Sequence, residues 1–160
     1  MNDVNDLLTP ETLGGVVATV IDNNPGMDQP MATRVVTEAL KFVDAAAKFP
    51  TVKITPSQVV DEGWHALILH TNPYARLCEL LGRFVHHYPE RPDSERFDPD
   101  ALTRTVALIE EAGHTADRDL WLSPAEALVT VAAKCSHTPK PGGCGPINPG
   151  KCASHCSSGD

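Results

Sequence analysis

The chain has 160 residues, with 13 Lys or Arg against 21 Asp or Glu, so its net charge is −8 when the histidines are neutral. This acidic balance argues against a nucleic-acid binder and against docking on anionic lipid, because both need clustered basic side chains. No apolar run approaches the roughly 20 residues of a membrane span, and the acidic N-terminus lacks the pattern of a secretory signal, so we expect a soluble cytoplasmic protein.

Two amphipathic helices are predicted at the start of the chain. The first has Thr9 as its N-cap and Pro10 at its first position, and it ends at the turn over 23–26. The second starts near Pro30 and is bounded by Pro50. Both carry apolar residues at the i, i+3, i+4, i+7 spacing that is typical of a half-buried helix.

Two further helix starts combine a capping residue with proline. Residues 55–58 form a predicted capping box, in which Thr55 caps a third helix. Residues 71–73 repeat the combination and start a fourth helix. We expect this fourth helix to end at the histidine pair 86–87.

The second half of the chain also predicts helices. Residues 98–99 start a fifth helix, and Gly113 is the residue expected to end it. A short apolar segment follows at 119–122, and residues 123–124 start a last helix. Because no segment shows the alternation of a sheet-forming strand, we predict an all-α protein, a compact bundle of five to six helices.

The last 26 residues have a different composition. Residues 135–160 are rich in Pro, Gly and Cys, and Ile147 is their only large aliphatic residue. Such a segment cannot bury enough apolar surface to offset its ordering entropy, which is about 1–2 kcal/mol per residue. We therefore predict a helical domain over 1–134 and an irregular tail over 135–160, either flexible or ordered by a metal ion.

The tail contains thiols and imidazoles that suit Zn²⁺ or Cu(I). In a protein without an export signal, metal ligation is favoured over stable disulfides. The spacing matches no standard zinc module, so a flexible tail, two disulfides and a modifiable peptide segment stay open as alternatives. The six candidate ligands are Cys135, His137, Cys144, Cys152, His155 and Cys156.

A second candidate site joins the predicted third and fourth helices. Asp61 and His65 are four residues apart and therefore share one helix face. If the two helices form an antiparallel hairpin, Asp61 meets His86 and His87. Two imidazoles and a carboxylate suit Zn²⁺ or non-haem iron. Helix dipoles alone also favour an acid near a helix start and histidines near a helix end, so a purely structural role stays open.

Several rare residues at fixed spacing resemble a known family. The segments 61–65, 71–78 and 82–89 carry the patterns D-x-x-W-H, T-x-x-Y-x-x-x-C and G-x-F-x-H-H-x-P. This combination resembles the glycine-rich domain-containing protein-like family, in particular its small bacterial members with Cys/His-rich tails. The resemblance implies a helical domain of largely unassigned activity, and it implies no established catalytic residues.

These observations predict a small metal-binding protein, with zinc as the expected ion and copper or iron as alternatives. The tail is expected to supply ligands or to contact a protein partner. A metal-dependent enzyme that uses Asp61, His65 and His87 is one alternative, although the sequence contains no nucleophile elbow, phosphate loop or HExxH motif. The other alternative is a precursor or partner protein whose tail is modified or recognised.

Overall fold

The computed structural model describes residues 3–88 and 100–122. Within these ranges the chain forms a short 3-10 helix, η1 (Val4–Leu7), and six α-helices, with no strand. The all-α prediction is therefore confirmed, whereas the predicted last helix and the tail lie outside the described residues. The α-helices are α1 (Pro10–Asn23), α2 (Gln29–Lys48), α3 (Gln58–Leu69), α4 (Thr71–Leu80), α5 (Ala101–Glu111) and α6 (Arg118–Leu122).

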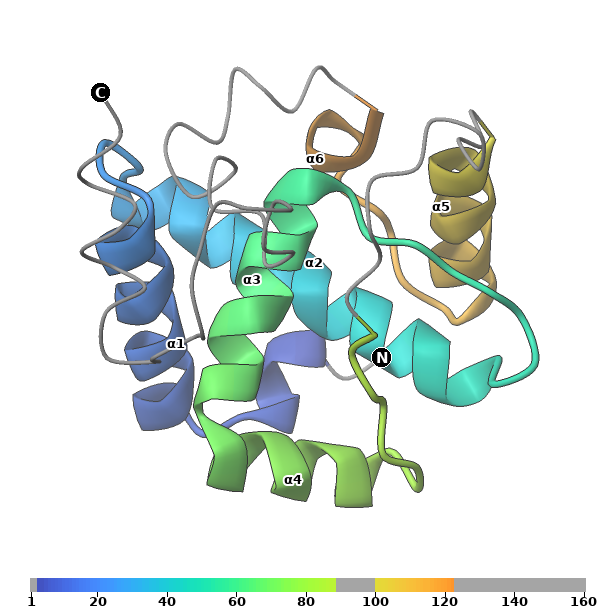
Figure 1. Cartoon of the computed structure of the whole chain (residues 1–160), viewed down its shortest axis with the longest axis horizontal. Coiled ribbons are helices and arrows are strands. Elements are labelled where there is room, and N and C mark those ends of the chain that lie inside the picture. The colour runs from blue at the N-terminus through green and yellow to red at the C-terminus, as the bar shows by residue number, and fades with distance from the viewer. Residues whose placement is uncertain (1–2, 89–99, 123–160) are drawn as a thin grey trace, which may run out of the picture.

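Helix α2 is the centre of the fold. It is 20 residues long, and Figure 1 shows it behind α3, with α1 on one side and α5 on the other. Helices α1, α3 and α5 all contact it. Its inner face is made of small and branched apolar side chains, which let several helices approach the same axis. Those buried on α2 include Ala32, Val35, Val36, Ala39, Leu40 and Val43.

Helix α3 crosses α2 closely at Gly63. A Cβ atom at this position would lie 2.8 Å from the carbonyl oxygen of Val35 and 3.0 Å from the Cβ of Ala39. Only a residue without a side chain fits such an approach. Positions two residues away on a helix are about 200° around its axis. The close crossing therefore turns Asp61 and His65 away from α2, on the outer face of α3.

Two predicted caps are wrong. The cap of α3 is Ser57, whose Oγ accepts the Val60 backbone N–H at 3.3 Å. The same hydroxyl donates to the Leu120 carbonyl at 2.7 Å, so the cap also ties α3 to α6. Helix α4 begins at Thr71 with His70 as its N-cap and no side-chain capping bond. Because His70 also ends α3, no loop separates the two helices.

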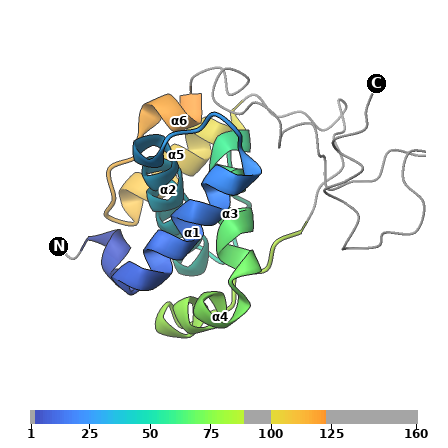
Figure 2. The ribbon, with the colours of Figure 1, turned by 90° about the vertical axis from the view of Figure 1, so that its left-hand side faces the viewer.

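Helix α4 ends at Leu80, well before the histidine pair 86–87 at which its end was predicted. Gly82 has a φ of +77°, and the Arg83 N–H donates to the Cys78 carbonyl. These features form a Schellman motif, which stops the helix at Leu80. Figures 1 and 2 both show α4 lying across the end of α3, so the two helices do not form the predicted antiparallel hairpin. Gly113 ends α5 in the same way, with a φ of +101°, as predicted.

Two buried acids on α2 hold the segment that follows α5. Glu38 accepts a hydrogen bond from Trp121 Nε1 at 2.8 Å and pairs with Lys41. Asp44 lies 2.6 Å from His114 Nε2 and pairs with Lys48. Buried carboxylates of this kind are stable only when they are fully hydrogen-bonded. This arrangement fixes α6 against the central helix.

Candidate metal centre

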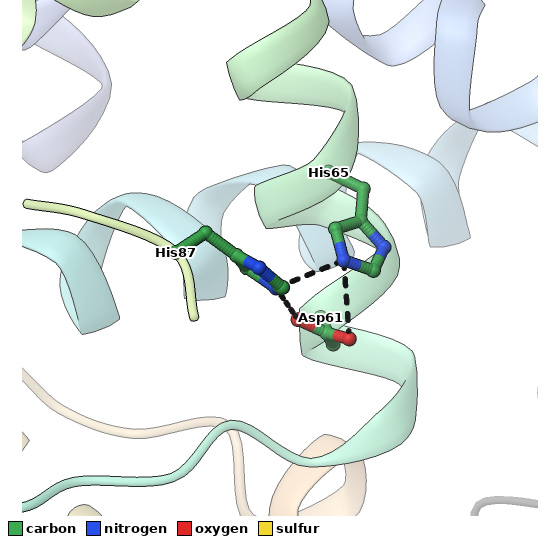
Figure 3. Close-up of side chains that lie close together, drawn as sticks. All are labelled: Asp61, His65 and His87. Atoms are coloured by element: carbon green, nitrogen blue, oxygen red, sulfur yellow. Dashed lines mark hydrogen bonds and ion pairs between the residues drawn. The ribbon is translucent and has the colours of Figure 1, made fainter. Parts of the chain in front are cut away.

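Three side chains converge on the outer face of α3, as Figure 3 shows. Asp61, His65 and His87 each offer one ligand atom, and these atoms lie within 4.8 Å of one another. His65 Nε2 is 2.9 Å from His87 Nε2, and His87 Nε2 is 3.1 Å from Asp61 Oδ1. His65 Nε2 is 3.4 Å from Asp61 Oδ2. One oxygen and two nitrogens therefore face a common point.

Asp61 and His65 reach this point from one helix, and His87 from an extended segment. The expected i, i+4 pair on α3 is present. After Gly82 the chain turns back toward α3 and carries His87 to it. The predicted cluster thus forms, although the hairpin from which it was predicted does not.

His86 does not join the cluster. Successive residues of an extended chain face opposite sides, so Val85 and His87 point inward and their neighbours point outward. The exposed His86 ring instead lies against Phe84, with 4.6 Å between the ring centroids. The sequence does not show this alternation, because two aromatic residues, Phe84 and Tyr88, lie on the outward side together with His86.

The inward side of this segment rests on α3 and α4. The Trp64 ring centroid lies 4.5 Å from that of His87. The Tyr74 hydroxyl donates to the Val85 carbonyl and accepts the Trp64 Nε1–H, the latter at 3.0 Å. Burial raises the pKa of the Tyr74 phenol, which keeps it protonated as a donor. This contact was not predicted from the sequence, because α4 was expected to continue to the histidine pair 86–87.

The three side chains are partly shielded and still reach solvent. Their exposed fractions are 30 % for Asp61, 17 % for His65 and 18 % for His87. A site at this depth strengthens electrostatic attraction relative to open water while leaving a path for an ion or a small ligand.

Glu62 lies beside the cluster and not in it. Its pKa is raised to about 7, chiefly by burial and secondarily by the charge of Asp61. A hydrogen bond with Asn24, at the end of α1, acts in the opposite direction. Glu62 therefore faces α1, whereas Asp61 faces His87.

The predicted tail ligands lie outside the described residues, so their role stays a prediction. They are Cys135, His137, Cys144, Cys152, His155 and Cys156. Cys78, the cysteine within the described part of the chain, is buried in α4. It contributes to the core, as free cysteines commonly do.

A protein-family model described as UCP032817-like matches residues 10–108. The chain belongs to the UCP032817-like family. This match corrects the resemblance to the glycine-rich domain-containing protein-like family, because the same residues are matched by a different, uncharacterised family. The short patterns are a weak guide to the family, because Trp64, Tyr74 and Gly82 occupy structural positions in this fold.

The UCP032817-like match includes all three converging residues and excludes α6 and the tail. No curated protein and no solved structure matches the chain. Among the described helices, none combines the length and the apolar character needed to cross a membrane.

Proposed function

We propose that this member of the UCP032817-like family binds a divalent metal ion through Asp61, His65 and His87, with zinc as the first candidate. The observation that carries the proposal is the spacing of the ligand atoms: the two Nε2 atoms lie 2.9 Å apart, and each lies near one oxygen of the Asp61 carboxylate, at 3.1 Å for His87 and 3.4 Å for His65. Tetrahedral zinc, with ligands at about 2.0–2.2 Å, holds them about 3.3–3.5 Å apart. Small side-chain adjustments therefore suffice to admit the ion.

Hydrogen-bond chemistry gives separate support. A ring nitrogen carries at most one hydrogen, so it either donates or accepts. If one imidazole donates to the other, the accepting nitrogen has no hydrogen for the nearby Asp61 oxygen. If both nitrogens carry hydrogens, they repel each other across 2.9 Å. A cation resolves this conflict, because it accepts a lone pair from all three atoms at once.

A metal-dependent enzyme is the second candidate. Three protein ligands leave one position on a tetrahedral ion for water or substrate, which is the arrangement of catalytic zinc sites. When bound, zinc would lower the pKa of that water to about 7. The same two histidines and one carboxylate also suit non-haem iron. The partial exposure of the three side chains favours an accessible fourth position.

The tail keeps its proposed role as a further set of ligands or as a contact for a protein partner. Its cysteines would ligate as thiolates, whereas the α3 site offers only nitrogen and oxygen. Cobalt separates the two kinds of site, because thiolate ligands add charge-transfer absorption that imidazole and carboxylate lack. Any test of the α3 site on the full chain therefore benefits from cobalt as the probe.

The test is titration of the full chain with Co²⁺, followed by displacement with Zn²⁺. We expect a visible spectrum without thiolate bands for the α3 site. His87→Ala should weaken binding at that site by more than about 100-fold, because even changes to groups behind the ligands cost about 10–100-fold. Copper and iron are compared in the same displacement assay.

His86→Ala is the matched control, since it removes the adjacent imidazole that faces outward. It should leave the affinity of the α3 site unchanged. Equal losses in the two variants, or wild-type affinity in His87→Ala, would refute the assignment of His87. Wild-type affinity in Asp61→Ala and His65→Ala as well would refute the site.

A further inference from the structure

The extended segment that carries His87 is attached to the helices through one phenol. The Tyr74 hydroxyl, on α4, donates to the backbone carbonyl of Val85. It also accepts the Trp64 Nε1–H at 3.0 Å, which leaves its own hydrogen directed at Val85. The bond is buried on both sides, since Tyr74 is 4 % and Val85 is 8 % exposed.

We propose that Tyr74 is a positioning residue that presents His87 to the metal ion. The inference rests on the proposed function and assigns a task to a residue outside the ligand set. Val85 and His87 lie two residues apart on one side of the extended segment. Fixing the Val85 carbonyl therefore fixes the side from which the imidazole approaches α3.

This attachment matters because inward and outward side chains alternate along the extended segment. Without it, the segment could rotate and exchange the inward and outward side chains, as a change of register does in a strand. His86 would then face α3 in place of His87. The Trp64 ring, 4.5 Å from the His87 ring, limits the same rotation. Tyr74 and Trp64 thus act on His87 together, one through the backbone and one through the ring.

The direct test is Tyr74→Phe, which removes the hydroxyl and keeps the ring. We expect zinc affinity at the α3 site to fall about 10- to 100-fold, the usual effect of losing a group that orients a ligand. The cobalt spectrum should change as well, because the His87 ligand is then held in a different geometry. A general loss of stability would not alter the spectrum of the bound ion.

Tyr88→Phe is the matched control. It deletes the same atom one residue from His87, on a side chain that is 77 % exposed. Thr37→Val is the stability control, because it removes a hydroxyl that donates to Asn5, from α2 to η1. Both variants should keep wild-type affinity and spectrum.

A second measurement does not depend on the folding of Tyr74→Phe. The chain has two tyrosines, so 3-fluorotyrosine in a Tyr88→Phe background places one fluorine label, at Tyr74. We expect the fluorine resonance to shift during zinc titration, in step with occupancy of the α3 site. The shift should be absent when His87→Ala is added.

The outcomes separate this inference from the proposed function. Wild-type affinity in Tyr74→Phe, or a fluorine resonance that zinc leaves unmoved, would overturn the role of Tyr74 and leave the site standing. An equal loss in Thr37→Val would also overturn it, because the effect would then follow stability. Binding that His87→Ala leaves intact would overturn the proposed function itself.

Discussion

Gly63 shows how one missing side chain positions a site. Its Cα approaches α2 so closely that the Val35 carbonyl oxygen would lie 2.8 Å from an added Cβ. Backbone atoms cannot move aside as a flexible side chain can, so a substitution must push the helices apart. The outer face of α3, with Asp61 and His65, would then shift relative to His87.

We predict that Gly63→Ala lowers the free energy of unfolding by about 1–3 kcal/mol, the usual cost of overpacking. It should also weaken metal binding, because it separates α3 from its neighbours. Gly14→Ala is the control: Gly14 lies inside α1 and an added Cβ meets nothing within 4 Å. That variant should gain up to about 1 kcal/mol from helix propensity. Urea unfolding measures the stability of both variants. A Gly63→Ala variant as stable as the wild type would contradict the close crossing.

At the residue scale, spacing predicted part of the candidate site. The pairing of Asp61 with His65 followed from helical periodicity, which is a local property. His87 was predicted together with His86, because the distinction depends on where α4 ends. The position of Tyr74 and the burial of Glu38 depend on contacts between distant segments, and no local pattern in the sequence contains them.

An ion pair joins α2 to Asp117, the residue just before α6. Arg34 Nε is 2.7 Å from Asp117 Oδ2, and a second guanidinium nitrogen is 3.0 Å from Oδ1. Two-point pairing of this kind is stronger than a single contact. The hydrogen bond from Arg34 lowers the pKa of Asp117 and raises that of Arg34. Partial exposure, 42 % for Arg34 and 24 % for Asp117, limits the stabilisation.

We predict that Asp117→Asn lowers the free energy of unfolding by about 0.5–1 kcal/mol at pH 7. The folded-state pKa of Asp117 lies below its unfolded value, so its contribution is present above about pH 4 and is lost as the pH falls through the folded pKa. The difference in the free energy of unfolding between the wild type and Asp117→Asn should therefore disappear in acid.

Urea unfolding at pH 7 and at successively lower pH measures this difference in the free energy of unfolding. Glu110→Gln is the control, because its ion pair with Arg118 is more exposed, at 42 % and 64 %. Glu110→Gln should lower the free energy of unfolding by less than Asp117→Asn does at pH 7. If Asp117→Asn loses the same free energy of unfolding at every pH, the lost stability has an origin other than the ion pair.

At the element scale, several helix starts were predictable, whereas the start of α6 and the direction of α4 were not. Caps and prolines mark helix starts locally, and Thr9 does accept the Thr12 N–H as predicted. Helix α4 ends because of Gly82. The apolar residues after Gly82 favoured a longer helix in the prediction. The angle between α3 and α4 follows from tertiary packing, which helical periodicity does not encode.

At the scale of the whole molecule, the described helices form one core. It extends from Val4 near the start of the chain to Trp121 in α6. The three converging residues belong to this core domain and to the region matched by the family. Apolar periodicity and capping residues predicted the helical class, and composition set the last 26 residues apart, whereas the structure of those residues stays a prediction.

The charge of the whole chain also favours the proposed ligand. A net charge of −8 attracts cations and repels anions. Within that field, the two histidines and one aspartate supply specific ligands. The tail, with six further candidate ligands, would add a second and chemically different site on the same molecule.

The most direct test is the intact mass of the full chain after incubation with zinc, in native and in denaturing conditions. We predict a native-only excess of at least one zinc ion in the wild type. His87→Ala should lose one ion and His86→Ala should lose none, while ions held by the tail would remain in both. No native-only excess in the wild type, or an excess unchanged by His87→Ala, Asp61→Ala and His65→Ala, would contradict a metal site on α3.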